Sequence, residues 1–173
     1  GEYTVFVRDA YGCEKSQTVI VTKDSEPIIT LNVTDICVNE GEFQIEIDET
    51  TAGITPYYLS VNGSVYSPVT LPATLSNQNS GNYTIAIKDV NGCNDTKNIT
   101  IYSPLGLSSR VIKQPSCSLN NGEIQAIPVG GSGSFEYKID TGSYGTSPIF
   151  SGLSSGPHTI YIKDNSTLCE KSI

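Results

Sequence analysis

The clearest pattern in the chain is a strict alternation of apolar and polar positions that runs into a tight turn. In residues 81–93, Tyr83, Ile85 and Ile87 alternate with small or polar residues. A period of two predicts a β-strand with one buried face. The Asp-x-x-Gly sequence that starts at Asp89 suits a turn, because Asp accepts hydrogen bonds from turn amides and Gly supplies a positive φ. Apolar residues spaced by two then resume, so the segment is predicted to form a hairpin.

Near-copies of this hairpin occur before and after it. One copy covers residues 1–13, and another covers residues 156–164 and continues through a looser turn to Cys169. Three copies at similar intervals predict small domains in series rather than one large core. The expected boundaries are residues 1–24 for the C-terminal hairpin of a preceding repeat, 25–103 for a complete repeat, and 104–173 for a second repeat lacking its last strand.

The complete repeat carries further short alternating segments, and turn signals separate them. Asn62 and Gly63 form the strongest of these signals, because both residues reach positive φ readily. No helical period is present. Many short strands at close spacing predict an all-β chain of tandem immunoglobulin-like antiparallel β-sandwich repeats. The expected strands lie near Ile29, Phe43, Tyr57, Val65, Val69, Leu75, Tyr83 and Ile99.

A tyrosine opens the repeated strand two residues after its glycine. Tyr83 therefore resembles the tyrosine corner of Greek-key sandwiches, in which the hydroxyl bonds to a nearby backbone group. His158 takes this position in the last copy. We expect this histidine, the only one in the chain, to have a structural rather than a catalytic role.

The charge of the chain narrows the range of partners. The formal net charge is -8 and the pI is about 4.5. Nucleic acid is therefore not an expected partner, because binding to a phosphate backbone depends on clustered Lys and Arg. The sequence contains no apolar run of the length needed to span a bilayer, so no membrane insertion is expected within these residues. Pro27 and Pro104 stiffen the short segments between repeats, which favours a semi-rigid row of domains.

The five cysteines occupy equivalent places in successive copies. Three close the hairpin turn, and two follow the first strand of a repeat. Such regularity predicts disulfides and an oxidising compartment. No Cys-x-x-Cys pair exists, and one histidine does not complete a zinc site. The turn cysteines are Cys13, Cys93 and Cys169, and the loop cysteines are Cys37 and Cys117.

Two disulfide pairings fit the order of the cysteines. One joins cysteines within a domain, Cys37 to Cys93 and Cys117 to Cys169. The other crosses the linkers, Cys13 to Cys37 and Cys93 to Cys117, with the same sequence separation in both copies. We favour the first, because it leaves each domain self-contained. Against it, the end of the first strand and the last hairpin turn lie at opposite ends of a simple immunoglobulin sandwich. Free buried thiols are the third alternative.

Catalytic chemistry has little support in the sequence, and we predict that the chain is not an enzyme. Glu46 and Asp48 are paired carboxylates that suit glycoside hydrolysis in principle, but their spacing on a wet strand is ordinary for solvated charge. We expect no cofactor, with calcium as the alternative. The recurring turn aspartates, Asp9, Asp89 and Asp164, offer the oxygen ligands that calcium favours, although an aspartate opening a turn needs no ion.

The chain resembles the SprB-type repeats of Bacteroidetes gliding-motility and cell-surface adhesins. The resemblance lies in Gly-x-Tyr-Thr-(Val or Ile)-x-(Val or Ile)-x-Asp-x-x-Gly-Cys, and in residues 130–142 and 150–156. It implies a large, multi-repeat protein exported by the type IX secretion system to the bacterial cell surface. In the last copy, His158 and residues 165–168 depart from the pattern, which places the turn geometry there in question.

From this resemblance we expect a stalk segment of a surface adhesin, a semi-rigid spacer that supports adhesion and, in the gliding case, motility. Its partners would be neighbouring repeats of the same chain, surface polysaccharide or a substratum, and gliding or secretion machinery bound by other regions. The alternatives are a carbohydrate-binding module and an accessory domain of a secreted hydrolase. Outward aromatics for stacking on sugars are Phe6, Tyr58 and Tyr161.

Overall fold

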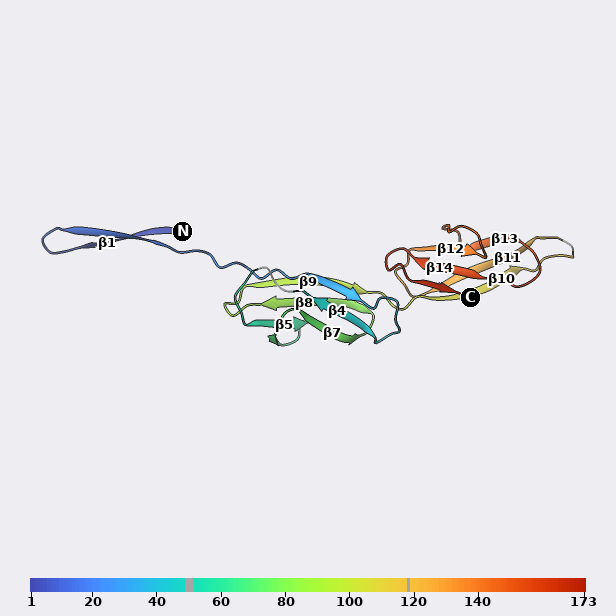
Figure 1. The fold of residues 1–173 in the computed structure, drawn as a ribbon, viewed down its shortest axis with the longest axis horizontal. Helices are drawn as coiled ribbons and strands as arrows, with labels where there is room; N and C mark the ends of the chain where they lie inside the picture. Colours follow the sequence, from blue (N-terminus) through green and yellow to red (C-terminus); the bar gives the residue numbers. More distant parts are fainter. Residues whose placement is uncertain (49–51, 118) are drawn as a thin grey trace.

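A computed structural model describes residues 1–48, 52–117 and 119–173, and every regular element within these ranges is a β-strand. The predicted all-β class with immunoglobulin-like antiparallel sandwiches is confirmed. Figure 1 shows a hairpin, a middle sandwich and a last sandwich in an end-to-end row. Among the described residues, no helix is long and apolar enough to cross a membrane.

The first body is a two-stranded hairpin of β1 (Glu2–Arg8) and β2 (Glu14–Ile20). The strands pair antiparallel from Glu2 opposite Ile20 to Arg8 opposite Glu14. Every residue in both strands is exposed. The alternating apolar residues of β1 have no sheet to pack against, and Val7 keeps 68% of its surface exposed.

The middle sandwich packs a three-stranded sheet on a four-stranded sheet, in the order β3-β4-β7 and β6-β5-β8-β9. All pairings are antiparallel. The first sheet consists of β3 (Leu31–Thr34), β4 (Phe43–Ile47) and β7 (Ala73–Gln78). The second consists of β5 (Tyr57–Val61), β6 (Ser67–Val69), β8 (Gly81–Lys88) and β9 (Asn94–Ile101).

Burial in the middle sandwich follows the sequence alternation. In β4 and β8, Phe43 and the isoleucines are buried, Tyr83 is partly buried, and the residues between them are partly or fully exposed. The two inner faces meet in one core whose buried members are Ile29, Phe43, Ile45, Ile47, Leu59, Ile85, Ile87 and Ile101. Val65, where a strand was predicted, instead lies beyond the Asn62–Gly63 turn and is 91% exposed. Both turn residues have positive φ, as predicted.

The last sandwich repeats this plan in two three-stranded sheets, β10-β11-β13 and β12-β14-β15. Its own core contains Leu105, Ala126, Tyr137, Ile160, Ile162 and Cys169. The strands are β10 (Gly106–Lys113), β11 (Gly122–Val129), β12 (Phe135–Ile139), β13 (Ile149–Leu153), β14 (Ile160–Asp164) and β15 (Glu170–Ser172).

The prediction that this repeat lacks its last strand needs correction. β15 pairs with β14 over three residues, in the place that the eight-residue β9 occupies in the middle sandwich. In place of β6, the last sandwich has a single bridge between Tyr137 and Gly145.

Candidate functional site

The turn of the repeated hairpin is built around its aspartate. The Asp89 amide donates to the Cys93 carbonyl at 2.9 Å. In return, Asp89 Oδ1 accepts from the amides of Asn91 and Cys93, at 3.0 and 2.9 Å. Asp9 makes the same two carboxylate contacts, both at 2.9 Å. The sequence therefore encodes a closed turn in which a carboxylate satisfies backbone donors that strand pairing leaves free.

The last turn reaches the same closure with one more residue. The Asp164 amide donates to the Cys169 carbonyl at 2.9 Å. Asp164 Oδ1 accepts from the amides of Ser166 and Thr167. Leu168, at φ 60°, takes the left-handed conformation that Gly92 has in the middle turn. The departure from the sequence pattern thus lengthens the turn without moving its cysteine away from the end of the hairpin.

In both sandwiches the second carboxylate oxygen ties the turn to another loop. Asp89 Oδ2 accepts from the Ile54 amide at 3.2 Å, and Asp164 Oδ2 accepts from the Ser132 amide at 2.6 Å. Asp89 is 1% exposed and Asp164 is fully buried. Gly131 is required beside Asp164, because its φ is +71° and an added Cβ would lie 2.7 Å from Oδ2.

Burial alone would raise the pKa of Asp164. The hydrogen bonds from the Ser132 amide, the Thr167 amide, the Ser132 hydroxyl and the Ser166 amide outweigh this effect and lower the pKa. Asp164 is therefore a buried anion held by backbone and hydroxyl donors.

Calcium was the alternative suggested by the three turn aspartates. Their contacts with amides account for the position of each carboxylate. Within the described part of the chain, one group has ligand atoms close enough for a metal ion: Asp24, Asp89 and Cys93, all within 4.8 Å of one another. A thiol beside two carboxylates is not the all-oxygen set that calcium prefers. Calcium binding at these turns remains a hypothesis.

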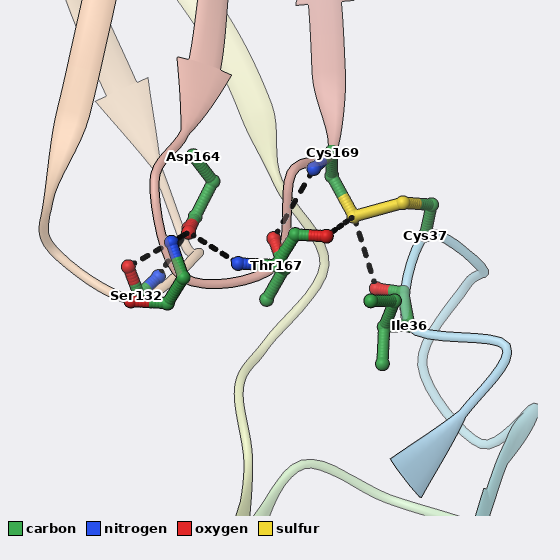
Figure 2. The surroundings of a disulfide bond; sticks show 7 residues. Ile36, Cys37, Ser132, Asp164, Thr167 and Cys169 are labelled. Carbon is green, nitrogen blue, oxygen red and sulfur yellow. Dashed lines mark hydrogen bonds between the residues drawn. A yellow bond between two sulfur atoms is a disulfide. The ribbon is translucent and has the colours of Figure 1, made fainter.

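One disulfide joins the two sandwiches. Cys37, in the loop after β3, is bonded to Cys169, in the turn before β15, with a Cα–Cα distance of 5.5 Å. Figure 2 shows the two cysteines meeting from different domains. Cys169 Sγ also lies 3.3 Å from the Ile36 carbonyl oxygen, a close contact in which the bonded sulfur has no hydrogen to donate.

Both predicted pairings are therefore wrong, since neither joined Cys37 to Cys169. Cys13, Cys93 and Cys117 are free, with Cys13 and Cys117 exposed and Cys93 partly so. Only Cys37 and Cys169 of the four candidate disulfide residues are bonded, and they are bonded to each other.

The position of each cysteine along its sandwich explains the error. β9 starts at Asn94, beside Cys93, and its other end at Ile101 lines the same hollow as Ile36 and Phe43. Eight strand residues span roughly 26 Å, whereas a disulfide requires Cα atoms within about 7 Å. Cys37 and Cys93 are therefore at opposite ends of the middle sandwich, as the objection from immunoglobulin topology anticipated.

The linker-crossing alternative fails for the same reason. Cys117 follows β10, whose first residue, Gly106, adjoins the linker and whose last, Lys113, lies at the far end. Cys13 likewise lies at the end of the first hairpin that points away from the middle sandwich. Cys93 and Cys169 thus each lie at the end of their sandwich nearer the preceding part of the chain, whereas Cys37 lies at the end nearer the following sandwich.

A hollow of about 260 Å³ lies beside the disulfide between the two sandwiches. Val33, Ile36 and Tyr102 line it from the middle sandwich and the linker, and Ser166 and Thr167 line it from the last turn. The junction therefore combines a covalent link with incomplete packing, which permits limited bending.

The structural role predicted for His158 is supported by its contacts. The Tyr83 hydroxyl donates to the Asn79 carbonyl at 2.9 Å, and His158 Nε2 lies 3.1 Å from the Ser154 carbonyl, also four residues back. His158 Nδ1 is 2.7 Å from Asp140 Oδ2. Both ring nitrogens thus face acceptors, which favours the imidazolium form.

The hydrogen bonds from His158 to Asp140 and to the Ser154 carbonyl raise the pKa of His158. The hydrogen bond from His158, with that from the Thr159 amide, lowers the pKa of Asp140. Each partner thus stabilises the charged form of the other.

Two of the three predicted outward aromatics lie in lysine-centred clusters. The Lys88 ammonium is 4.4 Å from the Tyr66 ring centre and 5.7 Å from that of Tyr58. In the last sandwich, the Lys138 ammonium is 4.8 Å from the Tyr144 ring centre and 4.5 Å from that of Tyr161. These clusters were not predicted. Tyr66 and Tyr144 nevertheless occupy similar places in the sequence, shortly after the turns at residues 62–63 and 140–142. Phe6 lies on the exposed first hairpin.

The paired carboxylates considered for catalysis do not form a site. Glu46 is partly exposed on β4, and the exposed Asp48 accepts a hydrogen bond from the Thr30 hydroxyl at 2.7 Å. These contacts are those of carboxylates on the outer face and at the end of a central strand.

Comparison with known proteins bears on the fold alone. No protein-family model matches the chain, and no curated protein matches it. A similar solved structure is the C-terminal 282-residue fragment of intimin in complex with the intimin-binding domain of the translocated intimin receptor. The TM-score is 0.55 at 10% identity, over 84% of this chain and 62% of that one. The chain thus spans less than two thirds of that fragment, and the similarity supports an immunoglobulin-like all-β fold, which is not a typical enzyme fold.

Proposed function

We propose that this chain is a stalk segment of a large bacterial cell-surface adhesin, a semi-rigid spacer between the cell and an adhesive region. The observation that carries the proposal is the Cys37–Cys169 disulfide, which links the far end of one sandwich to the near end of the next. A bond in this position resists separation of neighbouring domains under tension. Disulfides are also typical of secreted and surface proteins.

Three further features support a spacer. The domains lie in an end-to-end row (Figure 1). The net charge of -8 opposes collapse of the row on itself. The resemblance to SprB-type repeats adds export by type IX secretion and a role in gliding motility to the proposal.

Small-angle X-ray scattering tests the spacer on the whole chain. The oxidised protein is expected to show a narrow, elongated distribution of distances. In Cys37→Ser, the hollow at the junction and the short linker then permit wider bending, so the distribution broadens. Cys117→Ser is the matched control, because it removes an unbonded cysteine. An identical distribution in Cys37→Ser and the parent would contradict the mechanical role of the bond.

A second candidate function is polysaccharide binding through the two lysine-tyrosine clusters. Each cluster places tyrosine rings beside a cation on the outer face of a sheet, and aromatic faces stack on sugars. Binding to a polysaccharide panel, measured with and without calcium, separates the two functions. Saturable binding lost in Tyr58→Ala and Tyr161→Ala, but kept in Tyr11→Ala, would assign adhesion to the repeats. The absence of binding would leave the spacer.

A further inference from the structure

We propose that the free cysteines Cys93 and Cys117 are the two ends of a continuing series of disulfides between repeats. In this series the loop cysteine of each repeat bonds to the turn cysteine of the next. Cys93 would take the loop cysteine of a preceding copy, and Cys117 would take the turn cysteine of a following copy. The partner at both sites is thus another copy of the same repeat, and the inference rests on the tandem arrangement in the proposed function.

The first support is the bond already present. Cys37 is a loop cysteine of the middle sandwich and Cys169 is the turn cysteine of the next one. It is the only disulfide among the described residues, and it follows this rule.

The second support is the equivalence of the turns. The amides of Asp9, Asp89 and Asp164 each donate to the carbonyl of the turn cysteine, at 3.0, 2.9 and 2.9 Å. Each carboxylate also accepts two further turn amides. Cys93 therefore occupies the same place at the end of its hairpin as Cys169, despite the extra residue in the last turn.

The third support is the direction in which the free cysteines face. Cys93 lies beside the linker from the preceding hairpin, where the Asn91 side-chain amide donates to Asp24 at 2.6 Å. Cys117 is exposed in the loop beyond β10, at the end of the last sandwich that faces away from the middle one. Both thiols thus lie where the next domain in the row would dock.

Formation of each bond is an oxidation. Two thiols lose two protons and two electrons, and one S–S bond forms. The acceptor is a disulfide oxidant, which is reduced to its two thiols.

The test inserts a second copy of residues 22–101 directly after Ile101 in the full chain. At the new junction, Ile101 is followed by residues 22–30, which in the parent chain link the first hairpin to the middle sandwich. The native linker is thus reproduced between the two copies. After refolding with oxidised and reduced glutathione, thiols are alkylated and the disulfides are mapped by mass spectrometry. The insertion adds Cys37 and Cys93, yet the number of free thiols is expected to stay at the three of the parent chain. A rise of two would overturn the proposal.

Copy-specific substitutions provide the matched control. Cys93→Ser in the second copy is expected to leave the first copy's Cys37 free, giving one more free thiol. The same substitution in the first copy is expected to remove one free thiol and leave both bonds intact. The reverse result would indicate bonding within a repeat and would overturn the proposal.

A second variant keeps the inference testable if the longer chain does not fold. In the parent chain, residues 165–168 are replaced by Val-Asn-Gly, the residues between Asp89 and Cys93. If the two turns are equivalent, the last turn cysteine still bonds to Cys37. A free Cys37 in this folded variant would show that only the longer turn makes the bond. Because the readout is bond identity, it is independent of the scattering test of the spacer.

Discussion

The middle and last sandwiches solve the same structural problems with different residues. At the start of the repeated strand, a phenol in one and an imidazole in the other reach a carbonyl four residues back. At its end, Gly92 in one turn and Leu168 in the other adopt the left-handed conformation. The comparison teaches that the fold needs a donor and a positive φ at these places, and that more than one residue type supplies each.

The largest expected difference between the two domains concerns their cores. Ile87 and Ile162 are both fully buried, and replacing either with Ala is expected to cost about 4 kcal/mol. The described core of the last sandwich has fewer buried members, so the loss takes a larger share of its stability. Urea unfolding followed by NMR should show Ile162→Ala unfolding the last sandwich first. Equal shifts of both domains in this variant would contradict independent cores.

The buried turn aspartates give the next effect. Asp164→Ala removes the acceptor of several donors and is expected to cost about 3 kcal/mol, because hydrogen bonds to charged groups are the stronger kind. Asp89→Ala should act in the same direction on the middle sandwich. Asp9→Ala is the control, since Asp9 is exposed. Chemical denaturation measures the loss of unfolding free energy in each variant. A loss in Asp9→Ala as large as in the other two would show that the hydrogen bonds from the Ile54 and Ser132 amides contribute nothing.

A smaller effect is expected at the tyrosine corner. Tyr83→Phe deletes only the hydroxyl that donates to Asn79 and should cost about 1 kcal/mol of middle-sandwich stability. Tyr102→Phe is a suitable control, because Tyr102 is 40% exposed in the linker. A loss of the same size in the control would assign the effect to something other than the corner.

The histidine in the same place of the last sandwich makes the stability of that domain depend on pH. The folded pKa of His158 is raised, so its stabilisation is complete below the unfolded value of about 6.5 and is lost as pH rises through the folded pKa. The folded pKa of Asp140 is lowered, so its share is present above its ordinary value of 3.8 and is lost as pH falls below it. The last sandwich should therefore weaken from neutral to mildly alkaline pH.

His158→Tyr sharpens this test by restoring the residue of the other copy. The melting temperature of the last sandwich in this variant should no longer fall between neutral and mildly alkaline pH. A fall that persisted unchanged would assign the pH dependence to other groups.

The fold could be predicted from the sequence because local pattern and tertiary structure agree. Alternation at Ile85 and Ile87 selects the buried face, and Asp89 with Gly92 closes the turn. The apolar character of Val65 predicts a strand, but the turn signal before it is the stronger one. Val65 therefore lies outside the strands and is exposed.

The disulfide could not be predicted correctly, because pairing depends on which ends of two domains meet. The expectation of self-contained domains favoured a bond within one repeat, whereas Cys37 bonds past Cys93 and Cys117 to the last candidate. Two features of the sequence together could have predicted this bond. The loop cysteine and the turn cysteine lie at opposite ends of a sandwich, and in a tandem row the loop end of one sandwich meets the turn end of the next. The lysine-tyrosine clusters were missed because each draws its members from two strands and a loop.

The placement of the cysteines also constrains the order of events when the protein is made. Synthesis proceeds from the N-terminus, so Cys93 and Cys117 are both available to Cys37 before Cys169 exists. A folded middle sandwich holds Cys93 at the far end from Cys37, which removes one wrong partner. Oxidation after folding therefore favours the native link over a bond between Cys37 and Cys93.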